Sequence, residues 1–268
     1  MALIRGGSPY ATDEALSTLR PVASGNVVDA AWDREGVLWF SRASGSEFDG
    51  CDLFREGAPT VPVWRYSDLA GAADRGSGLC SIEPGKKGEL LFDTSNQTAG
   101  SSGVWTIDLA TGAITEISPG YRPTLSNNAQ TFLLTQHVYL SSGGSDDRLM
   151  SLDPAARKDH PVRVLGVPAG TATGPAAFSA DGESVAVVYA LTSGRPGIAV
   201  GPLRGPKTRL LVGDAQTTFE GLAWMAHDSA ILALRLPANQ ETGDLIRVSA
   251  KDGRATVLAT NVAGFAVR

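Results

Sequence analysis

The chain has 268 residues, of which 43% are hydrophobic and 19% are charged, and its formal net charge is −5. This length can bury one large core, and the 31 glycines and 15 prolines suit many short strands and tight turns better than helices or a disordered chain. A sequence pI near 5.2 argues against nucleic acid or an anionic membrane surface as a partner.

The first 24 residues contain two short apolar stretches, 2–5 and 16–22, which we expect to be outer strands of a sheet. The N-terminus lacks the continuous apolar segment of a signal peptide. The longest apolar run, residues 185–191, is too short for a membrane span, so we expect no membrane insertion. Either the protein is cytosolic, or the chain begins after a removed leader and belongs in a bacterial periplasm or cell envelope.

The next part of the chain repeats one layout: a short apolar strand, a polar or glycine turn, and a second apolar strand. Between these hairpins lies a second pair of strands, seen most clearly at residues 103–118 and 244–260. Each repeat thus holds four strands in about 48 residues, which is the size of one blade of a β-propeller. The segments with this layout are residues 27–42, 78–95, 121–140, 174–191 and 219–237.

The last residues, 262–268, resemble the inner strand of a further repeat. Combining them with the N-terminal strands would remove two exposed sheet edges. The sequence therefore predicts an all-β chain: one β-propeller domain over residues 1–268, six-bladed, with a composite last blade of three strands closed by both chain ends. A five-bladed propeller with frayed ends is the alternative.

Four residues have a predicted place in the blades. Trp32 and Trp224 close equivalent inner strands and are expected in the core between blades. Cys51 opens a third strand and Cys80 lies on an innermost strand, which are about 9–10 Å apart laterally if blades stack strand on strand. A disulfide needs Cα atoms within about 7 Å, so we expect two free thiols.

One turn carries a family resemblance. Residues 178–187, with Ser179, Asp181 and Gly182, resemble the Ser-Pro-Asp-Gly signature of TolB-type, or WD40-like, propeller repeats. In the other repeats the Asp-Gly pair is replaced, for example by Asn127-Asn128. The resemblance implies a binding or scaffolding propeller, often in a bacterial envelope, and leaves open that the chain is part of a longer protein.

A weaker resemblance concerns metal chemistry. Residues 220–224 resemble an element of six-bladed lactonases, in which the glutamate ligates a divalent metal, so Glu220 is the metal ligand of an alternative reading as a lactone or ester hydrolase. A hard cation needs several ligands. His137, His160 and His227 have no ligand spacing. We therefore expect no metal, no cofactor and no catalytic residue.

The residues just before each inner strand are the candidate binding site, because in propellers these loops surround one mouth of the central channel. Aromatic, charged and small polar groups in one place suit a peptide or small polar ligand. The sequence thus favours a non-enzymatic binding propeller with a protein or peptide partner, of open oligomeric state. The candidates are Asn26, Ser77, Tyr121, Arg122, Thr173, Phe219, Glu220 and Asn261.

Overall fold

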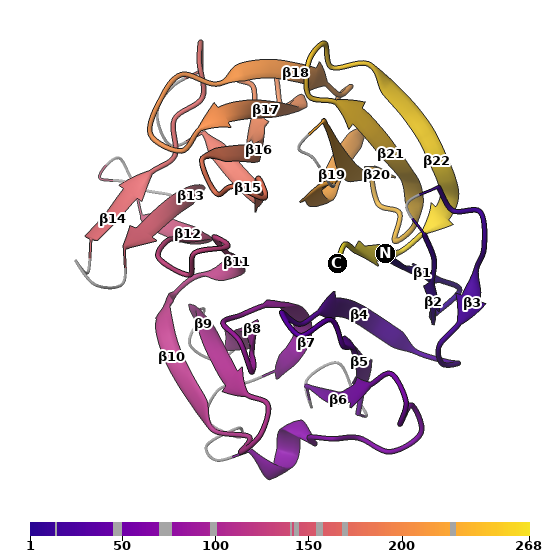
Figure 1. Cartoon of the computed structure of the whole chain (residues 1–268). Coiled ribbons are helices and arrows are strands. Elements are labelled where there is room, and N and C mark those ends of the chain that lie inside the picture. The colour runs from indigo at the N-terminus through magenta and orange to yellow at the C-terminus, as the bar shows by residue number, and fades with distance from the viewer. Residues whose placement is uncertain are drawn as a thin grey trace. The chain divides into compact units, whose positions relative to one another are not determined.

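The computed structural model describes residues 1–13, 15–44, 50–69, 77–96, 101–139, 141, 145–153, 158–167, 171–225 and 229–268. Their strands form six sheets, five of four strands and one of three, which are the blades (Figure 1). Apart from one 3-10 turn, η1 (Tyr66–Asp68), the named elements of this part are strands. The chain is thus all-β, as predicted. It divides into two compact units, residues 1–123 with 262–268 and residues 124–261, and both division points fall inside strands.

In the first unit, both chain ends contribute to one blade (Figure 1). The C-terminal strand pairs with the N-terminal strand, with Ala2 opposite Ala266 and Ile4 opposite Gly264. This confirms the composite blade, but with four strands and not three, because residues 8–11 form a strand of their own. In order across the sheet the strands are β23 (Gly264–Ala266), β1 (Ala2–Arg5), β2 (Ser8–Ala11) and β3 (Arg20–Pro21).

The other two blades of the first unit come from the first two repeats. The first has only three strands, since its expected fourth strand is replaced by residues 63–64, whose backbone bonds to Leu53. Its strands are β4 (Val27–Trp32), β5 (Leu38–Ala43) and β6 (Cys51–Arg55). The next blade has β7 (Ser77–Pro84), β8 (Glu89–Asn96), β9 (Ser101–Asp108) and β10 (Ile114–Pro119).

The remaining three blades are four-stranded and antiparallel, and each runs in chain order from its innermost to its outermost strand. The first comprises β11 (Tyr121–Leu125), which contains the unit boundary, β12 (Phe132–Tyr139), β13 (Ser145–Asp153) and β14 (Lys158–Pro161). The second comprises β15 (Ala172–Phe178), β16 (Ser184–Ala190), β17 (Pro196–Pro202) and β18 (Thr208–Val212). The third comprises β19 (Thr217–Trp224), β20 (Ala230–Pro237), β21 (Gly243–Ser249) and β22 (Ala255–Val262).

The turn after the innermost strand explains why the repeat signature tolerates substitution. The Ser179 hydroxyl donates to Asp181 Oδ1 at 2.6 Å and accepts from the Ser184 amide, while Gly182 takes φ +74°. In the preceding blade Ser126 donates to Asn128 Oδ1 at 2.7 Å and accepts from the Thr131 amide. Asp and Asn both accept this hydrogen bond, so the turn survives the change of residue.

Cys51 and Cys80 form a disulfide, with 5.0 Å between their Cα atoms, so the prediction of free thiols is wrong. The prediction assumed that blades stack strand on strand. Cys80 instead lies in the irregular stretch of β7 between Gly78 and Ile82, and its carbonyl accepts from the Ser41 hydroxyl of β5. The innermost strand of one blade therefore crosses several strands of the other, and the start of β6 meets it.

We expect this disulfide to contribute strongly to stability. It closes a loop with a sequence separation of 29, so replacing both cysteines by alanine should lower the free energy of unfolding by about 3–4 kcal/mol. Urea unfolding measures this loss. Denatured wild-type protein should show no reactive thiol unless a reductant is added, and two thiols without reductant would contradict the assignment.

The composite blade makes a second prediction. Ala2, Leu3 and Ile4 are fully buried, and β23 covers the open edge of their strand. Deleting residues 264–268 should lower the midpoint of thermal unfolding by more than about 5 °C, because backbone groups and apolar side chains of β1 become exposed. Circular dichroism follows the transition. Deleting residues 267–268 alone leaves β23 in place and serves as the control; equal midpoints for the two deletions would refute the role of β23.

Candidate functional site

The innermost strands of the first unit begin with irregular backbone. The pairing of β4 with β5 shifts register between Val27 and Asp29, and that of β7 with β8 shifts between Gly78 and Ile82. Asn26, Leu79 and Arg122 have φ angles of +48°, +59° and +52°, a left-handed conformation that is uncommon for residues other than glycine. Such bulges turn backbone groups away from their own sheet. These groups need partners elsewhere.

Asp29 supplies such a partner. Its Oδ2 accepts from the Ile82 amide of the next blade at 2.9 Å, while its Oδ1 accepts from the Ala30 amide at 2.8 Å. Removal of this half-buried carboxyl from water raises its pKa to about 7; the two amides lower the pKa, and the charge of Asp93 raises it further. Asp29 therefore joins two blades, and near neutral pH part of the molecules carry a proton on it.

Asp93 repeats this arrangement one blade further on. Its Oδ2 accepts from the Arg122 amide at 2.8 Å, so the carboxyl group of β8 binds the start of β11. Burial raises the pKa of Asp93, against the opposing effects of the Arg122 amide and the Arg122 charge. The guanidinium carbon of Arg122 lies 5.9 Å from the centroid of the Tyr121 ring, close enough for a cation–π contact.

Glu83 completes a group of three acidic residues. Its side chain is exposed to water, yet protein atoms crowd its carboxyl group, and this burial, followed by the charges of Asp29 and Asp93, raises its pKa. In the described residues no three His, Cys, Asp or Glu side chains lie close enough together to hold a metal ion. With its pKa raised to about 8, Glu83 presents a mainly protonated carboxyl group near neutral pH, and a nearby cation would favour its carboxylate form.

The candidate residues of the sequence analysis did not include these three acids. Asn26, Tyr121 and Arg122 lie at the starts of β4 and β11, where the acids act, and Ser77 is the first residue of β7. The missed residues had a signal: Asp29 and Asp93 interrupt apolar strands, and Glu83 ends one. A charged residue within a buried strand needs a specific partner.

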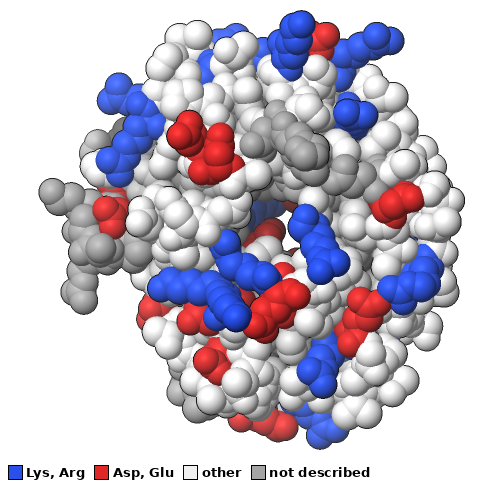
Figure 2. Space-filling model, viewed as in Figure 1, with Lys and Arg blue, Asp and Glu red and all other residues white. Residues whose placement is uncertain are grey.

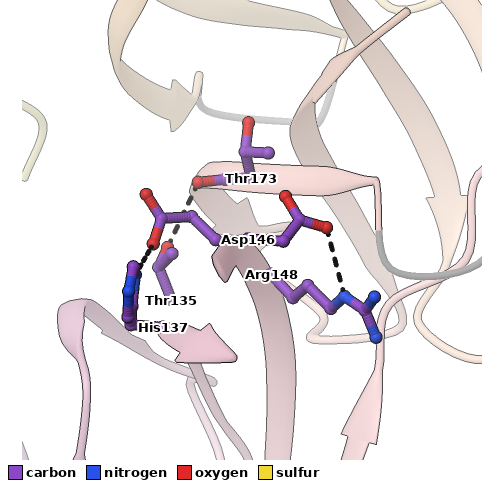
Figure 3. A network of polar contacts seen from close by, with 6 residues as sticks. Thr135, His137, Asp146, Arg148 and Thr173 are labelled. Atoms are coloured by element: carbon purple, nitrogen blue, oxygen red, sulfur yellow. Dashed lines mark hydrogen bonds and ion pairs between the residues drawn. The ribbon is translucent and has the colours of Figure 1, made fainter. Parts of the chain in front are cut away.

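In the second unit the start of β15 is held differently. The Thr135 hydroxyl of β12 donates to the Thr173 carbonyl at 3.2 Å (Figure 3), so a neutral side chain joins these two blades. Further along β12, His137 Nδ1 lies 2.9 Å from Asp147 Oδ1. Arg148 Nε lies 3.3 Å from Asp146 Oδ2. The backbone carbonyl of Thr173, one of the candidate binding residues, therefore belongs to a structural contact between blades.

One of the remaining candidates needs correction. Phe219 is buried in a core cluster with Val188 and Ala233, so its side chain is not available to a ligand. Asn261 lies near the end of β22, shortly before the inner strand β23, and has a φ angle of +56°. Glu220 is exposed at the register shift between Phe219 and Gly221, outside any metal-ligand group of the described residues. His227 lies outside the described residues.

The two tryptophans face neighbouring blades. Trp32 is buried with Ile4 and Phe40, as predicted, and the Arg268 guanidinium carbon lies 5.7 Å from the centroid of its ring. Trp224 is only half-buried, and its indole N–H donates to the Ala177 carbonyl of β15 at 3.0 Å. The first is a core residue, whereas the second also supplies a hydrogen bond between blades.

The visible face of the molecule carries charges of both signs. On the face shown in Figure 2, Lys and Arg side chains lie among Asp and Glu side chains. Net charge alone therefore does not define a binding surface, and the distinctive feature of the first unit is the raised pKa of its inner carboxyl groups. No helix in the described part is long and apolar enough to cross a membrane.

No protein-family model matches the chain, and no curated protein matches its sequence. Solved structures are similar in fold. TolB from Acinetobacter baumannii has 13% identity and a TM-score of 0.66, over 98% of this chain and 66% of that chain. A putative TolB from Agrobacterium tumefaciens has 12% identity and a TM-score of 0.67, over 90% and 84%.

The tricorn protease is also similar, with 12% identity and a TM-score of 0.55 over 97% of this chain and 29% of that chain. This chain thus spans less than two thirds of the first TolB and of the protease. At these identities the likeness shows the fold alone. Together with the six sheets, it confirms the predicted six-bladed β-propeller.

The raised pKa of Asp29 gives stability a pH dependence of known sign. A carboxyl group whose pKa is higher in the folded state stabilises the fold most below about pH 4, and this contribution is lost as pH rises to about 7. Asp29→Asn stays neutral. The difference in free energy of unfolding between the variant and wild type should rise by about 2 kcal/mol from pH 4.5 to pH 8. Urea unfolding at each pH measures it.

Asp108→Asn is the control, because the pKa of Asp108 is shifted in the direction opposite to that of Asp29. Hydrogen bonds from Thr111 lower the pKa of this exposed carboxyl group, so its contribution is present at neutral pH and lost as pH falls. The Asp108 substitution should therefore cost stability at neutral pH and little near pH 3. The same pH slope for both substitutions would contradict the assignment of Asp29.

Proposed function

We propose that this chain is a non-enzymatic binding propeller that engages a protein or peptide partner. The proposed site in the first unit comprises Glu83, Asp29 and Asp93 with Tyr121 and Arg122. The observation that carries the proposal is the exposed side chain of Glu83 beside two further acids, with a pKa raised to about 8 by burial and then by their charges. A cationic group of a partner would stabilise the charged form of these carboxyl groups and so gain from binding next to them.

The neighbouring residues support a peptide as the ligand. Tyr121 and Arg122 are half-buried, so they combine an aromatic surface with hydrogen-bond donors next to the acids. Tyrosine and arginine are enriched among residues that dominate protein interfaces. Their backbone is held by Asp93, which limits the conformational freedom lost on binding.

No observation on the described residues favours the alternative, a metal-dependent hydrolase with Glu220 as a ligand, because no group of metal ligands forms around that residue. For the compartment, the disulfide supports the periplasm or cell envelope over the cytosol, since disulfides persist in oxidising surroundings. Recognition in that compartment would use the oxidised form described above.

Binding of defined peptides tests the proposal. Fluorescence anisotropy should show that a lysine- and arginine-containing peptide binds more tightly than neutral or acidic peptides of the same length, and that added salt weakens it. Glu83→Gln should weaken binding of the basic peptide about three- to tenfold, because glutamine cannot supply the carboxylate that a bound cation favours at this position.

Glu116→Gln is the matched control. Glu116 is exposed on β10, the outermost strand of the same blade, so its replacement removes the same charge at a distance from the site. Equal losses for the two variants would mean that only net charge matters. No preference among the three peptides would refute the proposed site.

A further inference from the structure

Two turns that follow inner strands of the first unit are joined to each other by charged side chains. The turn after β4 contains Arg34 and Glu35, and the turn after β7 contains Gly85 and Lys87. Arg34 Nε donates to the Gly85 carbonyl at 2.6 Å. Lys87 Nζ lies 3.3 Å from Glu35 Oε1. The guanidinium group of Arg34 is therefore held in a fixed place beside Gly85.

Two further cations lie close to this contact. Lys86 is exposed and directly follows Gly85 in the chain. The exposed side chain of Arg268 lies so close to Gly36 that a Cβ on this glycine would overlap its guanidinium group. Within the residues that the structure describes, neither Lys86 nor Arg268 forms an ion pair. The basic cluster, as we call it, consists of Arg34, Lys86 and Arg268.

Little negative charge balances the basic cluster. Asp33 lies in the same turn as Arg34, but its Oδ1 accepts from the Glu35 and Val37 amides. The carboxylate of Glu35 is paired with Lys87. The cluster thus has an excess of positive charge, in a chain whose formal net charge is −5. An anionic group of a partner would gain from binding beside it.

The basic cluster lies next to the site proposed above. Glu83 precedes Gly85 by two residues, so their Cα atoms are at most about 7 Å apart. Glu83 and Arg34 are both exposed. In the described part of the chain, however, Glu83 has no ion pair with a cation of the cluster or with another residue. A site for a cation and a site for an anion are thus neighbours that do not satisfy each other.

We propose that the partner segment carries a basic and an acidic residue two positions apart, and that the basic residue binds at Glu83 and the acidic residue at the basic cluster. This inference rests on the proposed function and names the kind of segment that the site selects. In an extended peptide, residues i and i+2 point to the same side and lie about 7 Å apart. That spacing matches the distance from Glu83 to Gly85, where Arg34 is bound.

An acidic residue of the same segment suits the basic cluster better than a separate anion does. Once the basic residue is bound, the acidic residue is held near the cluster, so its contact costs little further translational freedom. The guanidinium group of Arg268 lies over the ring of Trp32, with 5.7 Å between its carbon and the ring centroid. A guanidinium group in such a place can still bind a carboxylate through its N–H groups.

Fluorescence anisotropy with peptides of equal length tests the proposal on the full chain. The peptides contain Lys-x-Glu, Glu-x-Lys, or the same orders with glutamine in place of glutamate. Both orders are used because an extended segment can lie in either direction. In one order at least, glutamate should strengthen binding about two- to fivefold, the size expected of an exposed ion pair, and about 0.5 M salt should remove this gain. If glutamate gives no gain in either order, the proposal is overturned.

Two double variants locate the gain. Lys86→Gln with Arg268→Gln should abolish it without weakening the glutamine peptides. Lys86→Arg with Arg268→Lys keeps both charges and should keep the gain. Circular dichroism on heating should show that both variants keep the fold. A gain that persists when both charges are removed overturns the assignment to the basic cluster.

Arg55→Gln with Arg65→Gln is the matched control. Arg55 is the exposed last residue of β6, the last strand in the sheet of the first blade, and Arg65 is exposed in the segment that follows. This double variant removes two positive charges of the same unit and should leave the gain from glutamate unchanged. An equal loss in this control would mean that only net charge acts, and would overturn the proposal.

Glu83→Gln separates this inference from the proposed function. The variant should remove the advantage of the peptide lysine over glutamine and leave the gain from glutamate in place. If lysine is recognised through Glu83 and glutamate adds nothing, this inference fails and the proposed function stands. If Glu83→Gln changes the binding of none of the peptides, both fail.

Discussion

The bulged innermost strands of the first unit leave backbone amides that their own sheets do not bind, and the structure depends on how these amides are satisfied. A buried N–H without a partner is costly. Asp29 and Asp93 each accept such an amide from the following blade, that of Ile82 and that of Arg122. These two hydrogen bonds join consecutive blades: Asp29 of β4 binds β7, and Asp93 of β8 binds the start of β11.

The placement of Asp29 and Asp93 between blades also determines the chemistry around them. Burial raises the pKa values of Asp29, Asp93 and Glu83, and the charges of Asp29 and Asp93 add to the shift of Glu83. Glu83 alone of the three is exposed, so a requirement of the fold sets the electrostatics of an accessible carboxyl group. The disulfide joins the same two blades close to the Asp29–Ile82 hydrogen bond, because Cys80 lies in the same bulge as the Ile82 amide.

At both the inner and the outer edges of the blades, backbone groups lack a neighbouring strand of their own sheet. The two kinds of edge differ in how this is compensated. Inner edges receive hydrogen bonds from side chains of a neighbouring blade, by a carboxylate in the first unit and by the Thr135 hydroxyl in the second. Outer edges have no such neighbour, so sequence composition protects them. The strand β22, which has no charged residue and no proline, is the exception.

The sequence by itself determined the repeat, the strand pairs within each blade and the composite blade, because apolar alternation and turn residues act over short distances. It placed Asn26 and Arg122 just before inner strands, but the bulges there came from the structure. Only tertiary structure decided that Asp29, Glu83 and Asp93 interact, that Cys51 meets Cys80, and that Phe219 points into the core. Each of these depends on how one twisted blade crosses the next, and the strand pattern within a blade carries no information on that crossing.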